Sequence, residues 1–139
     1  MKHSPGFLKL VDDAKSRVRE VSVEETRKKL ETGSARVIDI REESEWAAGH
    51  IRGAEYLGRG ILERDIEQRV PDTNTQLILY CGGGFRAALS ADNLQKMGYG
   101  TLLRWPEAGG SGGTKDCRWR YPAAELCKVL DVTKSHSIS

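Results

Sequence analysis

The residues of this sequence best suited to chemistry are a cysteine, three glycines and an arginine that follow an apolar run. The run is Leu77–Tyr80, the cysteine is Cys81, and the arginine is Arg86. A short apolar run bounded by glycine predicts a buried strand. Open parallel sheets bind ligands just beyond the carboxyl ends of their strands. We therefore expect Cys81 to lie where such a fold carries out its chemistry.

The glycines after the cysteine have a physical role in this prediction. Without side chains, Gly82, Gly83 and Gly84 allow successive backbone N–H groups to turn inward and form an anion-binding nest. The helix predicted to follow, Ala87–Met97, adds free N–H groups and the positive end of its dipole. A cysteine in this field, with the Arg86 charge beside it, is expected to be a thiolate and therefore a nucleophile.

The alternative interpretation of this loop is structural. Free cysteine is among the most buried residue types, so a cysteine at a strand end followed by a glycine turn has a purely structural explanation. The Cys-Gly-Gly-Gly run alone favours that explanation. The succession of strand, cysteine, glycines, arginine and helix favours the nucleophile.

Length and composition limit the class of protein. The 139 residues fit one domain with room for a core. With 38% hydrophobic and 30% charged residues and a net charge of +2, the chain is typical of a soluble globular protein, and nucleic-acid or anionic-membrane partners are not expected. No apolar run approaches the ~20 residues of a membrane span, and the N-terminus lacks the apolar segment of a secretion signal.

The cysteine count argues for a reducing environment. Cys81, Cys117 and Cys127 are odd in number and form no Cys-x-x-Cys pair, so neither a disulfide framework nor a zinc site is predicted. No phosphate-binding Gly-x-x-x-x-Gly-Lys motif is present either. We expect a cytoplasmic protein without a metal or cofactor.

The hydrophobic pattern predicts strands and helices in alternation. Helices are predicted at 5–18, 22–32, 44–48, 60–70, 87–97 and 123–130, and strands at 19–21, 36–40, 55–57, 77–80 and 101–104. This alternation implies βαβ units, a parallel sheet and right-handed crossovers. We divide the chain into an N-terminal helical extension (1–18), which is expected to pack over an edge of the fold, a main domain (19–130) and a polar C-terminal tail (131–139).

Two serines are predicted to begin helices. Ser22 and Glu25 match the capping-box pattern, in which the serine is the N-cap and the glutamate bonds back to its backbone. Ser44 is the predicted N-cap of the short helix 44–48.

With these elements placed, two motifs carry a family resemblance. The first covers Val37–Glu42, continues through Glu45-Trp46 and ends at Gly49–Ala54, while the second covers Leu79–Arg86 and extends to Gly98-Tyr99. Together they resemble the rhodanese (thiosulfate sulfurtransferase) homology family in its single-domain form, from about Val21 to Pro122. The resemblance implies a rhodanese-like three-layer α/β fold, with a central five-stranded parallel sheet flanked by helices.

The resemblance also implies an activity. In this family a six-residue loop from cysteine to arginine goes with sulfur transfer, and one residue more goes with phosphatases and arsenate reductases. The loop from Cys81 to Arg86 has six residues. The implied reaction moves sulfane sulfur from thiosulfate or a persulfide donor to a thiol or cyanide acceptor through a Cys81 persulfide.

Site roles follow from the resemblance and the expected topology. Cys81 and Arg86 are the expected catalytic residues, and the anion-binding loop between them consists of Gly82, Gly83, Gly84 and Phe85. Asp39 and Arg41 are expected to support the loop as an ion pair or cap; added positive potential from Arg41 or Arg59 is the alternative. His50 is interpreted as structural rather than as a general base.

The sequence departs from the family pattern in three places. Ala87 stands where serine is common, the run Pro106–Ser111 resembles an insertion, and the Gly112-Gly113 pair is separated from Trp119 by several residues. These departures concern the substrate-side wall more than the cysteine chemistry. Two alternatives stay open: a non-catalytic rhodanese-like module that binds a partner or senses sulfur, and an arsenate reductase or phosphatase. The physiological donor and acceptor, the oligomeric state, the role of the N-terminal helix and a redox role for Cys117 or Cys127 are also left open.

Overall fold

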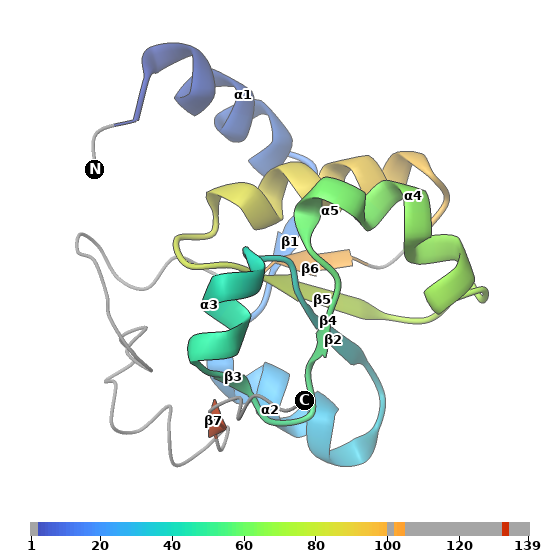
Figure 1. Ribbon diagram of the computed structural model, residues 1–139. Helices are drawn as coiled ribbons and strands as arrows, with labels where there is room; N and C mark the ends of the chain where they lie inside the picture. Colours follow the sequence, from blue (N-terminus) through green and yellow to red (C-terminus); the bar gives the residue numbers. More distant parts are fainter. Residues whose placement is uncertain (1–2, 100–101, 105–131, 134–139) are drawn as a thin grey trace.

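The computed structural model describes residues 3–99, 102–104 and 132–133 (Figure 1). The helices are α1 (Pro5–Lys15), α2 (Val23–Thr32), α3 (Glu43–Ala48), α4 (Arg59–Arg69) and α5 (Phe85–Lys96). The strands are β1 (Arg19–Glu20), β2 (Arg36–Asp39), β3 (His50–Ile51), β4 (Glu55–Tyr56), β5 (Leu77–Tyr80), β6 (Leu102–Arg104) and β7 (Val132–Thr133). The predicted alternation of strands and helices is confirmed.

The main sheet is parallel and runs in the order β1-β6-β5-β2-β4. Strands β2, β5 and β6 form its body, and β1 and β4 extend it at the edges with two residues each. The register places Asp39 opposite Tyr80 on one side and Tyr56 on the other. Strands β2 and β5 therefore end at the same level. Asp39 lies beside Tyr80, the residue that immediately precedes Cys81.

Helices cover both faces of this sheet, which explains why β5 is apolar throughout. Leu77 and Leu79 pack in a cluster with residues of α4 and α5, whereas Ile78 and Tyr80 pack in a second cluster against Leu30 of α2. Figure 1 shows α4 and α5 above the sheet and α2 below it. A strand buried on both faces has no polar side to alternate with its apolar one. The α/β arrangement with a parallel sheet and flanking helices is as predicted.

The N-terminal helix lies on the outer face of α5 (Figure 1). Val11 and Ala14 of α1 are buried against Ala88 and Leu89 of α5. The helix ends at Lys15, three residues before the predicted end. The expected packing of this helix on the main domain is present, and its apolar stripe lies against α5.

One of the two predicted helix caps is confirmed in part. Ser22 begins α2, and its hydroxyl oxygen accepts the Glu25 N–H at 3.0 Å. The Glu25 carboxylate pairs with the Arg19 guanidinium at 3.1 Å, and within the described residues it does not bond back to Ser22. A charged donor within reach competes successfully with a neutral backbone N–H for a carboxylate.

The prediction that Ser44 begins the short helix was wrong. The helix α3 begins at Glu43 and has Glu42 as its N-cap. The Glu45 side chain accepts the Glu42 N–H at 2.9 Å, which fixes the first turn earlier in the chain.

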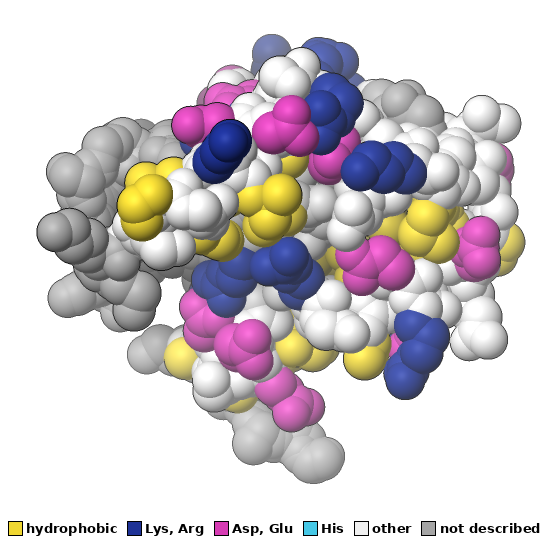
Figure 2. All heavy atoms as spheres, turned by 90° about the horizontal axis from the view of Figure 1, so that it is seen from above, with side chains coloured by type: hydrophobic (Ala, Val, Ile, Leu, Met, Phe, Trp, Pro, Cys, Tyr) yellow, Lys and Arg dark blue, Asp and Glu magenta, His cyan; other side chains and the backbone are white. Residues whose placement is uncertain are grey.

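Several predicted features lie outside the described residues: the glycine-rich connection 109–113, the helix 123–130, Cys117, Cys127 and Trp119. In the predicted tail, Val132–Thr133 form β7, which pairs antiparallel with β3. No helix in the described parts of the chain is long and apolar enough to cross a bilayer. Figure 2 shows cationic and anionic side chains interspersed on the face seen from above, with hydrophobic side chains between them.

Candidate active site

The candidate nucleophile lies between the end of β5 and the start of α5. Cys81 follows the last residue of β5, and the N–H groups of Gly84 and Ala87 donate to its Sγ at 3.1 and 3.4 Å. The first N–H groups of an α-helix have no partner within the helix. Because Gly84, the N-cap of α5, has no side chain to accept them, the cysteine sulfur does so instead. The helix dipole favours negative charge at this position.

The glycines shape the loop around the sulfur. Gly84 has φ of +87°, a left-handed conformation that favours glycine. Gly82 lies beneath the side chain of Arg86, since a Cβ at Gly82 would be 3.4 Å from Arg86 Nη2. The predicted gathering of loop, cysteine and arginine is therefore present in the structure.

The sulfur lies at the floor of this loop rather than on the surface. Cys81 is only 2% exposed, whereas Gly82, Gly83 and Arg86 are half-buried and form the rim. Hydrogen bonds to a charged group are stronger in such a water-poor site than in water. The arrangement suits an anionic sulfur that is shielded from bulk solvent.

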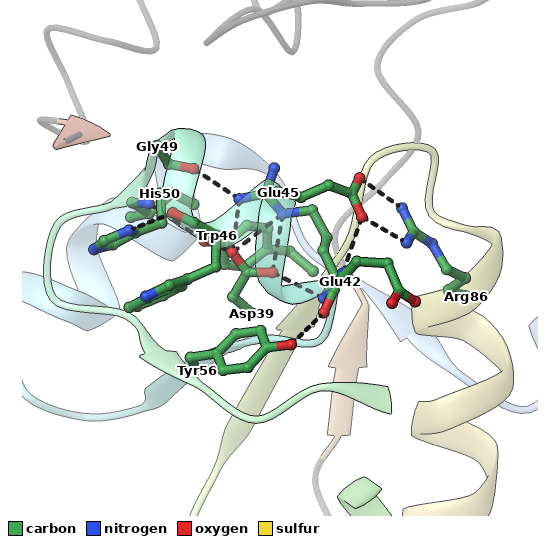
Figure 3. A network of polar contacts seen from close by, with 11 residues as sticks. Asp39, Glu42, Glu45, Trp46, Gly49, His50, Tyr56 and Arg86 are labelled. Atoms are coloured by element: carbon green, nitrogen blue, oxygen red, sulfur yellow. Dashed lines mark hydrogen bonds and ion pairs between the residues drawn. The ribbon is translucent and has the colours of Figure 1, made fainter. Parts of the chain in front are cut away.

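Arg86 is held by a carboxylate that the sequence analysis did not assign to the site. Its Nη1 and Nη2 donate to Glu45 at 3.0 and 3.3 Å (Figure 3). Burial acts to lower the pKa of Arg86, but Glu45 and Cys81 together outweigh burial and raise the pKa above its ordinary value. Arg86 is therefore a permanent cation whose charge is shared between Glu45 and the cysteine.

Glu45 should contribute to stability at neutral pH and lose that contribution in acid. Partial burial acts to raise the pKa of Glu45, but its bonds to Arg86 and to the Glu42 N–H hold the pKa below its ordinary 4.5. A carboxylate with a lowered pKa stabilises the folded state above its unfolded pKa and ceases to do so as pH falls through the folded value. We expect Glu45→Gln to cost about 0.5–1 kcal/mol at pH 7, because both partners are about one third exposed.

Denaturant unfolding of wild type and Glu45→Gln at pH 7 and below pH 4 measures this contribution. The difference between the two proteins should shrink at the lower pH. Arg36 and Glu55 form a surface ion pair elsewhere on the molecule, so Glu55→Gln is the matched control. A difference for Glu45→Gln that grows in acid would contradict the prediction.

Asp39 and Arg41 form a buried ion pair beside the loop. Asp39 is fully buried and accepts the Arg41 guanidinium through both carboxylate oxygens, with a shortest distance of 2.7 Å. It also accepts the Tyr80 hydroxyl at 2.7 Å, and that hydroxyl in turn accepts the Ile51 N–H. Since Tyr80 immediately precedes Cys81, this network fixes the end of β5 from which the loop starts.

Protonation states in this network are well defined by its geometry. Burial acts to lower the pKa of Arg41, but the Asp39 carboxylate outweighs it and the pKa is raised. Burial, reinforced by the Asp39 charge, holds the pKa of Tyr80 well above its ordinary value. Arg41 therefore stays charged and Tyr80 stays a neutral donor, which agrees with the expected ion pair and directs the Arg41 charge into the fold.

Two candidate residues remain, His50 and Arg59. His50 stacks on Trp46 with ring centroids 3.4 Å apart, and its Nδ1 lies 3.1 Å from the Trp46 carbonyl oxygen. Figure 3 shows His50 and Arg86 on opposite sides of the network. Arg59 is the first residue of α4, where its N–H donates to the Ile40 carbonyl at 3.0 Å. A role for Arg59 in donor binding stays a prediction.

Comparison with known proteins adds to this geometry. The sequence model of the rhodanese-like domain matches residues 22–109. The tRNA uridine(34) hydroxylase of Chlamydia felis is 28% identical over 127 residues, which cover 78% of this chain and 36% of that protein. The putative sulfur carrier protein YrkF of Bacillus subtilis is 26% identical over 89 residues, covering 63% of this chain and 47% of that protein. The chain thus spans less than half the length of these curated relatives.

Among solved structures, a polysulfide-sulfur transferase homodimer from Wolinella succinogenes is similar to this chain. The two are 27% identical with a TM-score of 0.62, and the match covers 75% of this chain and 78% of that one. The rhodanese-like domain of the Alr3790 protein from Anabaena shares the fold, with 20% identity, a TM-score of 0.56 and coverage of 66% and 68%.

Proposed function

This chain belongs to the family of rhodanese-like domains, and on that premise we propose that it is a sulfurtransferase that carries sulfane sulfur on Cys81. The observation that carries the proposal is the convergence of the Gly84 and Ala87 N–H groups on the cysteine sulfur at a helix N-terminus. Such donors stabilise both a thiolate and the persulfide anion that forms from it.

The first step would load sulfur onto the enzyme. The Cys81 thiolate attacks the outer sulfur of thiosulfate, and its lone pair forms the new S–S bond. The electron pair of the donor's own S–S bond leaves with sulfite. Arg86 lies beside the cysteine and helps to hold the anionic donor, although Glu45 takes part of its charge.

The second step would pass the sulfur on. A thiolate acceptor, or cyanide in an assay, attacks the outer sulfur of the Cys81 persulfide. The electron pair of the enzyme's S–S bond returns to Cys81, which regenerates the thiolate held by Gly84 and Ala87. Two sequential displacements on one sulfur predict ping-pong kinetics.

The donor is proposed as thiosulfate, a persulfide or a polysulfide. Two relatives support this class, since one is described as a polysulfide-sulfur transferase and another as a putative sulfur carrier. The six-residue loop from Cys81 to Arg86 supports it over phosphate or arsenate.

Mass spectrometry tests the proposal directly. The reduced protein is incubated with thiosulfate or with polysulfide, and its intact mass is followed by mapping of the Cys81 peptide. We expect a gain of one sulfur atom on Cys81 that cyanide removes. The Cys117 and Cys127 peptides of the same chain serve as internal controls.

Three outcomes would contradict the proposal. Absence of any gain with both donors would argue against sulfur transfer. Hydrolysis of an aryl phosphate, or reduction of arsenate, without a persulfide would favour the oxyanion alternative. A stable persulfide that no thiol acceptor removes would instead identify a sulfur-sensing module.

A further inference from the structure

The N-terminal helix touches the candidate active-site loop through one aromatic side chain. The ring of Phe85 packs edge-on against His3 and Phe7, with ring centroids 4.7 and 6.0 Å apart. Lys15 Nζ lies 5.1 Å from the centroid of the same ring. His3 and Phe7 also contact each other, at 5.2 Å between centroids. Phe85 is therefore held by residues from both ends of α1 and from the segment before it.

The other side of the Phe85 ring faces the loop itself. A Cβ at Gly83 would lie 3.6 Å from the ring, which is ordinary van der Waals contact. Phe85 also stands between Gly84 and Ala87, the two residues whose N–H groups donate to the cysteine sulfur. Whatever fixes Phe85 consequently fixes the backbone that carries these donors.

The contact between α1 and α5 is anchored independently of Phe85. Arg17 donates to both carboxylate oxygens of Asp92 in α5, at 2.8 and 2.9 Å. Val11 of α1 is fully buried against α5. The helix is thus held by Val11 at its centre and by Arg17 just beyond its last residue. The contact of Phe7 with Phe85 is not needed to keep α1 in place. The family match begins at residue 22, so α1 lies outside it.

We propose that α1 and the segment before it form a positioning element of the candidate site, in which Phe7 and His3 hold Phe85 and thereby align the Gly84 and Ala87 N–H groups on the sulfur. This inference rests on the proposed sulfur transfer. Hydrogen bonds weaken steeply as their angle departs from linearity. A small displacement of Phe85 would therefore reduce the stabilisation of the thiolate and of the persulfide while leaving the nucleophile in place.

Replacing Phe7 tests this role. We expect Phe7→Ala to lower the kcat/KM of sulfur transfer about tenfold, because part of a charge-assisted hydrogen bond is lost. Phe7→Leu, which keeps an apolar side chain against Phe85, should restore most of the activity. Leu10→Ala is the matched control on the same helix, since Leu10 is 57% exposed, and it should behave as wild type.

Hydrogen exchange provides a readout that does not depend on turnover. In Phe7→Ala the amides of residues 84–88 should exchange faster than in wild type, while those of α2 stay unchanged. Val21→Ala controls for general destabilisation, because Val21 is buried in the cluster on the opposite face of the sheet. It should lower the melting temperature without a local change at residues 84–88.

These measurements separate the two proposals. Equal exchange at residues 84–88 in wild type and Phe7→Ala would overturn the positioning role of α1. An activity loss in Val21→Ala equal to that in Phe7→Ala, at the same melting temperature, would overturn it as well. If wild type forms no persulfide, the proposed function fails, but the exchange comparison still decides whether α1 aligns the loop.

Discussion

Replacing Cys81 with serine is expected to abolish persulfide formation and to lower sulfur transfer by at least about a thousandfold, because the hydroxyl is a far weaker nucleophile than a thiolate. The fold should survive the change. The serine oxygen can accept the Gly84 and Ala87 N–H groups that now donate to the sulfur. Activity with thiosulfate and cyanide, intact mass after donor treatment and the melting temperature measure the three parts of this prediction.

A second substitution separates the role of this sulfur as a nucleophile from its role as the acceptor of the N–H groups at the start of α5. Cys81→Ala should also be inactive, but it leaves the Gly84 and Ala87 N–H groups without their acceptor. We expect it to be less stable than Cys81→Ser by about 1–3 kcal/mol, the cost of buried donors left unsatisfied. Equal stability of the two variants would show that the sulfur does not cap α5.

The other two cysteines provide controls for the assignment of Cys81 as the nucleophile. Cys117→Ser and Cys127→Ser should each retain transfer activity if Cys81 alone carries the sulfur. Turnover that persists in Cys81→Ser and disappears in Cys117→Ser would move the nucleophile to a different residue and contradict the assignment.

The position of the candidate nucleophile could be predicted because the information is local. An apolar run that ends in cysteine and glycines marks β5 and the turn after it within ten residues, and both are present in the structure. The first residue of α5 was harder to predict from the sequence. The sequence places it at Ala87, whereas the helix begins at Phe85, because Gly84 in a left-handed conformation and the sulfur of Cys81 together form an unusual cap.

The partners of the site residues could not be predicted, since they come from distant parts of the chain. Glu45 and Arg86 are 41 positions apart, and they meet only because β2 and β5 are neighbours and α3 follows β2. The sequence offers one signal for Glu45, its place in the first turn of the predicted helix at the same sheet rim. The periodicity of residues 5–18 predicts a helix, but nothing in it indicates Phe85 as a partner.

Removing the buried carboxylate beside the loop should destabilise the fold more than any surface change. Asp39→Ala removes the carboxylate that pairs with Arg41, a residue only 6% exposed, and that accepts the Tyr80 hydroxyl. Breaking a buried ion pair by removing one partner costs about 3–5 kcal/mol. Since small domains are stable by about 5–15 kcal/mol, a large share of the stability would be lost.

Urea unfolding of wild type and variants measures this loss. The control is Glu55→Gln, which breaks the pair with Arg36 at the same sheet, where both side chains are about one third exposed. That change should cost no more than about 1 kcal/mol. A midpoint for Asp39→Ala close to that of Glu55→Gln would show that the ion pair contributes little.

A paired substitution decides between the two interpretations of Arg41. Replacing both members of a buried ion pair with apolar residues of similar size is often neutral, because no charge is left uncompensated. Asp39→Leu combined with Arg41→Met should therefore recover part of the stability lost in Asp39→Ala. If Arg41 is structural, the folded double variant transfers sulfur at a rate near that of wild type. If its charge attracts the anionic donor, the double variant folds but its KM for thiosulfate rises, while its kcat at saturating donor is unchanged.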